Sequence, residues 1–420
     1  MELVADGIKE AEVRYNDSLE GRDIVIIGLQ PWYYEIGSNC KNIATYFAKN
    51  NNRVLYVDLP INRKTFLSKN KKAGIAMHCE VIKTKKDEIR QLESNMWELF
   101  PTSVIESINF LPSSSIFTAI NYLNNKRFAK NIKDATRKLG FKNIILFNDN
   151  DIYNGYFLKE LLQPSLYIYY FRDFLQGYDY WKKHTTVLEP KLIAKADLVV
   201  ANSTYYAEYC SGYNPNSHYI GQGCKLDLFN PESSAPIPDD VRHIEKSVIG
   251  YVGALDSVRL DLKILELIAR SHPEWNIILV GPEDDVFLNS SLHQINNIHF
   301  LGRKSIDLLP DYIRTFDVCI NPQLQNIITR GNYPLKIDEY LAMGKPVVAT
   351  RTKAMKLFEA HTFLADSPED YPALITKALN EYNQHMRQEG IDFANSHTWE
   401  NSMKALFSSI NATLSTKTSI

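Results

Sequence analysis

The chain has 420 residues, of which 45 % are hydrophobic and 23 % are charged, and its formal net charge is -2 at pH 7. This length exceeds what one hydrophobic core supports, so we expect two globular domains. The nearly balanced charge excludes a global attraction to nucleic acid or to an acidic surface, and any anion must be bound locally.

The cysteines are scattered and form no Cys-x-x-Cys pair, which indicates a reducing compartment and no zinc site. Residues 1–22 are charged throughout, unlike a signal peptide, and no stretch approaches the roughly 18 apolar residues needed to span a bilayer. We therefore expect a cytoplasmic protein.

Short apolar runs rich in β-branched and aromatic residues alternate with helical stretches in both halves of the chain. In the first half the predicted strands are 23–29, 53–59, 143–148, 166–171 and 197–201, and the predicted helices lie near 39–49, 127–139, 185–195 and 204–210. In the second half the predicted strands are 247–253, 276–281, 297–302, 317–321 and 346–350, and the helices lie near 261–271, 305–314 and 334–343. This alternation predicts βαβ units on parallel sheets.

A segment rich in Pro, Ser and Asp, residues 230–240, separates the two halves, and we predict that it is the interdomain linker. The predicted fold class is α/β, with two Rossmann-like doubly wound domains that face an interdomain cleft. We expect residues 1–235 to form the N-terminal domain, residues 236–395 the C-terminal domain, and residues 396–420 a helix that can cross back to the N-terminal domain. Ligands of such sheets bind outside the carboxyl ends of the strands, so the site is expected between the domains.

A dinucleotide-dependent enzyme is one candidate, because Asp58 closes the second predicted strand, where an acid often binds a ribose. The first turn reads GLQPWYYEIGSN, however, and lacks the pattern G-x-G-x-x-G. Its Pro31 and Trp32 would obstruct a tight phosphate loop. We therefore expect no bound NAD, and a turn-capping role for Asp58.

The segment 334–344 has the features of a helix with a ligand site at its first turn. Pro334 suits a first helical turn, and Gly344 suits a C-terminal cap. Lys336 and Glu339 share a face. The free N–H groups of a helix start and Lys336 can bind a diphosphate, and Glu339 can accept hydrogen bonds from a ribose diol. The alternative is a solvated Lys-Glu pair on an exposed helix.

Three segments resemble glycosyltransferases with the GT-B fold and a group 1, or family 4-like, donor domain. YPLKIDEYLAMGKPVVAT (333–350) resembles their donor-binding motif, SVIGYVGALDSVRLDLKILELIARSHPEWNIILVGP (247–282) the start of their C-terminal domain, and KADLVVANSTYYAEY (195–209) the end of their N-terminal domain.

The resemblance implies that Lys336 contacts the donor phosphates and Glu339 the ribose. It also implies that Gly253 and the loop through Arg259 approach the pyrophosphate or the sugar. Many retaining members of the family carry a second glutamate eight residues before the position of Glu339, where this chain has Gly331. The sequence therefore leaves open how the sugar is held and whether its configuration is retained or inverted.

The N-terminal half is expected to bind the acceptor. Arg172 and Asp173 follow a predicted strand and should face the cleft. Inverting enzymes similar to this chain use a carboxylate of this domain to deprotonate the acceptor hydroxyl, and Asp173 is the candidate; the alternative is an Asp paired with a basic neighbour on the surface. His184 is a second candidate. Glu35 and Asn39 either line the cleft or serve ordinary turn and cap chemistry.

The segment 62–90 is locally basic. It could rest on an anionic membrane surface, at the inner face of the membrane, and present a lipid-linked acceptor, or it could be a solvated face.

The resemblance as a whole implies a glycosyltransferase of the hexosyltransferase type, which transfers a sugar from a nucleotide-diphosphate sugar to a hydroxyl of a glycan or lipid-linked acceptor in surface polysaccharide biosynthesis. The nucleotide-diphosphate sugar is a co-substrate, no other cofactor is expected, and no Asp-x-Asp is placed to bind a metal. The alternatives are a sugar-nucleotide epimerase or other enzyme on the same fold, and a noncatalytic nucleotide-sugar-binding protein.

Overall fold

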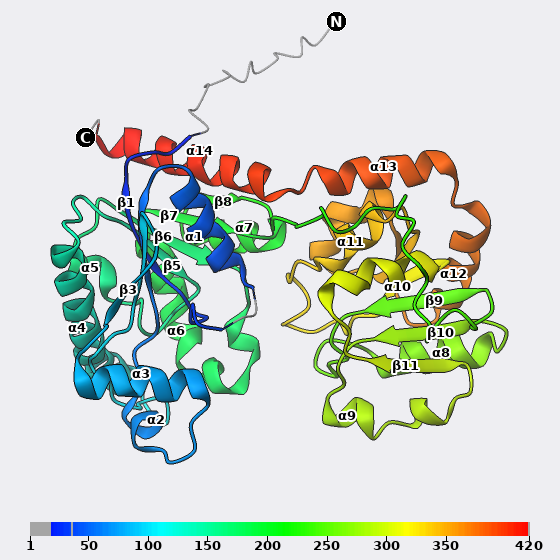
Figure 1. Ribbon diagram of the computed structural model, residues 1–420, viewed down its shortest axis with the longest axis horizontal. Coiled ribbons are helices and arrows are strands. Elements are labelled where there is room, and N and C mark those ends of the chain that lie inside the picture. The colour runs from blue at the N-terminus through cyan, green and yellow to red at the C-terminus, as the bar shows by residue number, and fades with distance from the viewer. Residues whose placement is uncertain (1–17, 35–36, 419–420) are drawn as a thin grey trace, which may run out of the picture.

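Two sheets, one in each half of the chain, form the frame of the molecule (Figure 1). The structure is a computed structural model that describes residues 18–34 and 37–418. Within these ranges no helix has both the length and the apolar character needed to cross a bilayer. The two parallel-stranded domains confirm the predicted fold class.

The N-terminal sheet has eight strands in the order β3-β4-β2-β1-β5-β6-β7-β8, and every neighbouring pair is parallel except β3 and β4. Its central strands are buried along their whole length because helices cover both faces, which explains their continuous apolar sequences. Its strands are β1 (Asp23–Ile27), β2 (Arg53–Val57), β3 (Ile89–Glu93), β4 (Met96–Leu99), β5 (Ile145–Asp149), β6 (Leu166–Phe171), β7 (Leu198–Ala201) and β8 (Ser217–Tyr219). Its helices are α1 (Asn39–Lys49), α2 (Arg63–Leu67), α3 (Ala73–Thr84), α4 (Ser114–Lys138), α5 (Leu158–Leu162), the 3-10 helix η1 (Leu175–Gly177), α6 (Asp179–Lys195) and α7 (Thr204–Ser211).

The C-terminal sheet has six parallel strands in the order β11-β10-β9-β12-β13-β14. Its strands are β9 (Val248–Val252), β10 (Asn276–Val280), β11 (Ile298–Gly302), β12 (Val318–Asn321), β13 (Val347–Thr350) and β14 (Phe363–Ala365). Its helices are α8 (Leu262–Ser271), α9 (Asp285–Leu288), η2 (Ser291–Gln294), η3 (Ile306–Leu308), α10 (Leu309–Thr315), α11 (Lys336–Ala342), η4 (Ala354–His361), α12 (Asp370–Glu381) and α13 (Gln384–Asn395).

The chain passes between the domains twice, and the two passages lie side by side. Gln222 still bonds to Asn39 of the first domain, whereas Cys224 donates its thiol to Asp338 of the second. The second passage follows α13, where the carbonyl of His397 accepts the N–H of Cys224 at 2.8 Å. The domains are therefore joined by two connecting segments that lie next to each other.

The predicted linker 230–240 is not the passage between the domains. Phe229 and Val241, which flank this segment, are buried in the core of the C-terminal domain. Asp240 bonds to Lys304 and to the hydroxyl of Tyr312. The composition of residues 230–240, rich in Pro and Ser, correctly predicts irregular backbone. This segment is not a linker, because it packs against the C-terminal domain.

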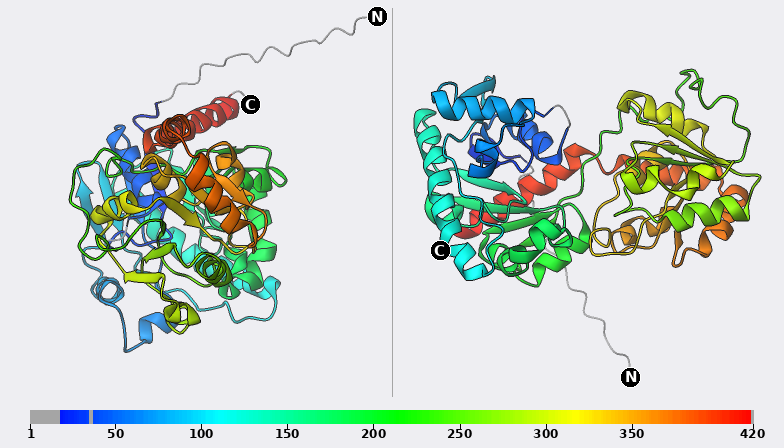
Figure 2. Two further views of the ribbon diagram at one scale, coloured as in Figure 1. Left: turned by 90° about the vertical axis from the view of Figure 1, so that its right-hand side faces the viewer. Right: turned by 90° about the horizontal axis from the view of Figure 1, so that it is seen from below.

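The helix α14 (Trp399–Thr418) runs back across the N-terminal domain, as Figure 1 and the right-hand view of Figure 2 show. Met403, Leu406 and Ile410 are buried in the same core as Ile24 of β1. The rings of Phe407 and Phe47 are 5.6 Å apart. One face of the first sheet is thus covered by a helix that follows the whole C-terminal domain in sequence.

Candidate active site

The helix α11 is held in place by contacts with β9 and with the two segments that pass between the domains. The hydroxyl of Tyr340 accepts the N–H of Val252, at the end of β9, at 2.8 Å. The buried carboxylate of Asp338 accepts hydrogen bonds from Tyr333 at 2.7 Å and from Cys224 at 3.3 Å, and His397 Nδ1 lies 2.7 Å from its other oxygen. The first turn of α11 is therefore anchored to β9 and to both interdomain passages.

Lys336 and Glu339 lie on the half-buried face of α11. Lys336 Nζ is 2.6 Å from the hydroxyl of Tyr251 and 4.1 Å from the centre of its ring. Burial lowers the pKa of Lys336 to about 7, although Glu339 opposes this, and burial raises the pKa of Glu339 to about 7. Burial thus disfavours the charged form of each side chain, and a bound anion would favour the charged form of Lys336.

Gly253 has no side chain, so its backbone stays accessible beside the ammonium group of Lys336. Its φ is +139°, a conformation that disfavours side chains, and a Cβ there would lie 3.0 Å from Lys336 Nζ. A Cβ on Gly281, at the end of β10, would lie 1.9 Å from the carbonyl oxygen of Gly253. The two glycines let the loops after β9 and β10 pack closely, as a site for a phosphate requires.

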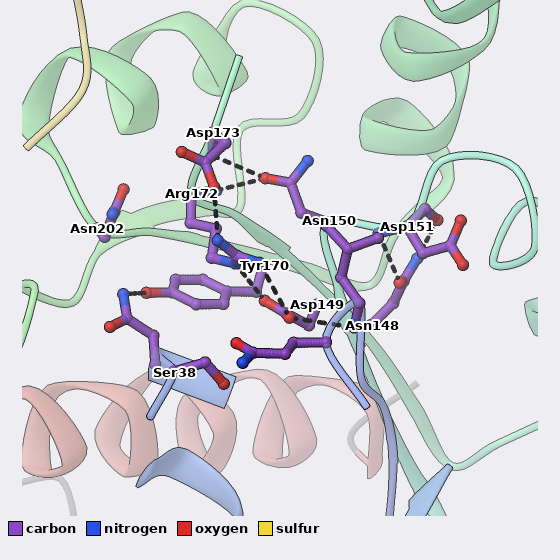
Figure 3. Close-up of polar contacts among 12 residues, drawn as sticks. Ser38, Asn148, Asp149, Asn150, Asp151, Tyr170, Arg172, Asp173 and Asn202 are labelled. Carbon is purple, nitrogen blue, oxygen red and sulfur yellow. Dashed lines mark hydrogen bonds and ion pairs between the residues drawn. The ribbon is translucent and has the colours of Figure 1, made fainter. Parts of the chain in front are cut away.

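The N-terminal domain presents Arg172 and Asp173 at the carboxyl end of β6, beside Asp149 at the end of β5 (Figure 3). The buried Asp149 bonds to Arg172 Nε at 2.7 Å, and Arg172 Nη1 donates to Asp173 Oδ2 at 2.5 Å. Asn150 Oδ1 accepts the backbone N–H groups of both Arg172 and Asp173 at 2.8 Å. Asp173 Oδ1, in contrast, accepts no hydrogen bond within the described ranges, so it is available to a ligand.

Arg259 connects the two halves of the site. Its Nη2 donates to the hydroxyl of Tyr178, in the other domain, at 3.1 Å. Burial lowers the pKa of Arg259, but Tyr178 and then Asp173 outweigh this effect and raise it. Arg259 also lowers the pKa of Lys336. The two domains therefore meet at Arg259 and Tyr178, beside the ends of the two sheets.

Asn39 belongs to an amide network beside this site. It donates to the hydroxyl of Tyr170 at 3.3 Å and to Gln222 at 3.0 Å, and Asn202 donates to the same oxygen of Gln222 at 2.7 Å. The position of Asn202 and Tyr170 relative to Arg172 can be followed in Figure 3. Asn39 thus lies at the carboxyl edge of the first sheet.

The other N-terminal candidates lie elsewhere. His184 is fully buried, stacks on Phe117 of α4 at 4.1 Å, and bonds to Ser114, so solvent does not reach it in this conformation. Glu35 lies outside the described residues. Asp58 accepts the N–H of Trp32 at 3.0 Å, as a turn-capping residue does.

The packing around Gly331 explains why no glutamate stands there. A Cβ at this position would lie 2.3 Å from the ring of Tyr205 and 2.4 Å from that of Tyr206, both in α7. The N-terminal domain therefore fills the space in which a side chain at position 331 would lie.

Several residues of the site were not predicted from the sequence. Asp149 and Asn150 directly follow the predicted strand 143–148, and the rule that ligands bind at strand ends could have found them. Tyr178 and Tyr251 give no such signal. Each accepts a hydrogen bond from a residue more than 80 positions away in the sequence.

Comparisons with known proteins agree with this architecture. Residues 246–383 match the family model described as Glycosyl transferases group 1. The putative teichuronic acid biosynthesis glycosyltransferase TuaH of Bacillus subtilis (strain 168) is 27 % identical over 212 residues, which cover 48 % of this chain and 53 % of that protein. The match thus spans about half the length of this curated relative.

Solved structures share the fold over nearly the whole chain. Sucrose-phosphate synthase from Thermosynechococcus elongatus aligns with a TM-score of 0.63 and 15 % identity, covering 91 % of this chain and 96 % of that one. Anabaena Alr3699/HepE in complex with UDP aligns with a TM-score of 0.64 and 15 % identity, covering 94 % and 100 %. The E. coli structure described as trehalose-6-phosphate bound with UDP-2-fluoro glucose gives a TM-score of 0.66 and 12 % identity, covering 93 % and 99 %. The chain thus has the GT-B fold, and its residues 246–383 are similar to the family described as Glycosyl transferases group 1.

Proposed function

We propose that this protein is a glycosyltransferase that moves a sugar from a nucleotide-diphosphate sugar to a hydroxyl of a glycan or lipid-linked acceptor, in the synthesis of a surface polysaccharide. The observation that carries the proposal is the hydrogen bond from Arg259 to Tyr178, which brings the Lys336 side of the second domain against the Asp173 side of the first. Transfer between two substrates requires a base on one side of the cleft and a binder of the leaving group on the other.

The similar proteins support the same chemistry. HepE was solved in complex with UDP, and TuaH is named for teichuronic acid biosynthesis. HepE was also solved in complex with UDP-glucose, which is therefore the first donor to test on this protein.

In the proposed reaction, Lys336, the backbone at Gly253 and Arg259 bind the diphosphate, and Glu339 binds the ribose. The acceptor oxygen forms a bond to the anomeric carbon while the bond from that carbon to the diphosphate breaks. Asp173 takes the proton of the acceptor hydroxyl. Lys336 and Arg259 offset the charge of the leaving diphosphate, so the reaction as proposed needs no metal ion.

We also propose a cytoplasmic location with peripheral contact at the inner face of the membrane through residues 62–90. This segment forms α2, α3 and the start of β3, and Leu67 in α2 is 70 % exposed. Exposed apolar and basic side chains on short helices suit the surface of an anionic bilayer.

The test of the function combines donor binding with turnover. A nucleoside diphosphate and its sugar should raise the melting temperature through mass action, and the nucleoside should not. Incubation with the nucleotide sugar should then release the nucleoside diphosphate, slowly by hydrolysis and faster with a suitable acceptor. An isomerised donor would instead identify an epimerase, and binding without any turnover would identify a binding protein.

Donor binding is expected to depend on pH through Lys336. A diphosphate favours the charged ammonium, so above the pKa of about 7 binding must be accompanied by proton uptake. The affinity should therefore fall above about pH 7, approaching tenfold per pH unit. Calorimetry in two buffers of different ionisation enthalpy measures the proton uptake directly. Lys336→Arg is the control, because its guanidinium stays charged and should abolish the dependence; a pH-independent wild type would contradict the assignment.

Glu339→Gln is expected to weaken nucleoside diphosphate binding by about 1 kcal/mol, roughly fivefold, because the amide is a poorer acceptor for a ribose diol than a carboxylate. The wild type should prefer the ribonucleotide to its 2′-deoxy counterpart, and the variant should lose part of this preference. If the wild type binds the ribo and 2′-deoxy ligands alike, Glu339 does not bind that hydroxyl.

A further inference from the structure

A groove of about 960 Å³ opens on the N-terminal domain. Its walls come from the segments that follow β2, β4, β5 and β6, together with α4 and the turn between α2 and α3. It therefore lies at the carboxyl edge of the first sheet, where ligands of such sheets bind. Its volume is at the upper end of the range for small-ligand pockets, enough for more than one sugar ring.

Aromatic side chains form one wall of this groove. Phe110 is 75 % exposed and Tyr180 is 61 % exposed. Trp181 is half-buried and packs on Tyr153 with ring centres 4.9 Å apart. Exposed aromatic side chains that gather in one groove are typical of a binding surface, and such rings offer flat faces that pack against the C–H faces of a pyranose.

Hydrogen bonds hold this aromatic wall in place. Asn109 Oδ1 lies 3.1 Å from the hydroxyl of Tyr153, and its Nδ2 donates to the carbonyl of Tyr180 at 2.5 Å. Lys183 Nζ donates to the carbonyl of Phe110 at 3.1 Å. The wall is thus preorganised, which reduces the entropy that a ligand must overcome on binding.

Part of the rim is basic. Lys64, Lys71 and Lys72 line it, and neither Lys64 nor Lys72 forms an ion pair within the described ranges. The acid in the lining, Glu106, is already engaged by Arg63 at 2.7 Å and by Arg127 at 3.0 Å. The groove therefore has an excess of positive charge that suits an anionic ligand.

The segment that follows β5 contacts Arg172, the neighbour of the proposed base Asp173, and also contributes to the groove. Asp149, at the end of β5, holds Arg172, and Tyr153 and Asn154, a few residues on, line the groove. Asp151, between them, accepts the backbone N–H of both Tyr153 and Asn154. The groove and the proposed base are thus linked through one short segment of chain, residues 149–154.

We propose that this groove binds an anionic oligosaccharide, with sugar rings against Phe110, Tyr180 and Trp181 and acidic groups at Lys64 and Lys72. The proposal rests on the proposed function and makes it more specific: the oligosaccharide is the growing end of the acceptor. Amide and hydroxyl side chains in the same lining, such as Asn154 and Ser107, can pair with sugar hydroxyls, which both donate and accept.

The test measures binding of three probes of equal length: a tetramer of a hexuronic acid, the same tetramer after reduction of its carboxyl groups, and a neutral glucose tetramer. The acidic tetramer should bind at least fivefold more tightly than the reduced one. Tyr180→Ala should weaken both by about tenfold, and Tyr213→Ala, which removes an exposed tyrosine elsewhere on this domain, should have no effect. The double variant Lys64→Gln, Lys72→Gln should bind the acidic and reduced tetramers alike.

Failure of this proposal is distinguishable from failure of the proposed function. Nucleoside diphosphate binding should be unchanged in all three variants, because none of the substituted residues lies in the donor site. No binding of any tetramer, or equal affinities for Tyr180→Ala and wild type, would overturn the groove assignment and leave the donor site intact. Lysine-dependent binding to vesicles containing anionic phospholipid, without tetramer binding, would overturn it in favour of a membrane surface.

Discussion

Asp173→Asn is expected to leave the affinity for the nucleotide sugar nearly unchanged and to lower turnover by roughly 100-fold or more. The substitution preserves the shape of the side chain and its contact with Arg172 Nη1, so only the capacity to take a proton is lost. Oδ1 of Asp173 accepts no hydrogen bond within the described ranges, which leaves it available to the acceptor hydroxyl. Steady-state kinetics with donor and acceptor varied separately give both quantities.

The matched control is Asp134→Asn. Asp134 also pairs with an arginine, Arg137, but on the surface of α4. Both variants should melt within a few degrees of the wild type, and only Asp173→Asn should be inactive. A folded Asp173→Asn protein with turnover within a few-fold of wild type would show that Asp173 merely orients Arg172. The buried position of His184 makes it a poor replacement, so the search would then turn to Glu35.

Lys336→Ala should weaken binding of a nucleoside diphosphate by about 1.5–3 kcal/mol, which is about 10- to 150-fold, and should change nucleoside binding little. The ammonium is held over the ring of Tyr251 and beside the backbone of Gly253, so its removal leaves the phosphate with Arg259 and backbone contacts. Calorimetry with the two ligands separates the phosphate contribution from that of the base and ribose.

Lys377→Ala, on the exposed surface of α12, is the control for a general loss of positive charge. It should reproduce wild-type affinity for both ligands. Equal losses for the diphosphate and the nucleoside in Lys336→Ala would show a disturbed domain rather than a lost phosphate contact. In that case the melting temperature of the variant without ligand should also fall.

The parts of the fold that could be predicted from the sequence are those with local signals. The central strands of both sheets are continuous apolar runs because both their faces are buried, and the helix carrying Lys336 and Glu339 is marked by a proline before it and a glycine after it. The edge strand β3, with the sequence IRQLE, is polar on its exposed positions and short, so it produced no strand signal.

The sequence predicted a site between the domains and candidate residues in each domain, but not the contacts that join the two domains. Lys336 and Asp173 each follow from a position at a helix start or a strand end. The contact of Arg259 with Tyr178 joins residues 81 positions apart in different domains, and no local pattern encodes it. The same holds for the packing of Tyr205 against Gly331, which depends on how closely the domains approach one another.

The return of α14 to the first domain has a consequence for the order in which the protein folds during synthesis. Domains generally fold as they leave the ribosome, the earliest first. Here the face of the first sheet around Ile24 is covered only in part, by α1, until Trp399 to Ile410 have been translated, whereas the apolar core of the second domain is built from residues 229–394 and is complete before them. The domain that is made first is therefore finished last, and its exposed apolar face is the surface that a chaperone would have to protect while the rest of the chain is made.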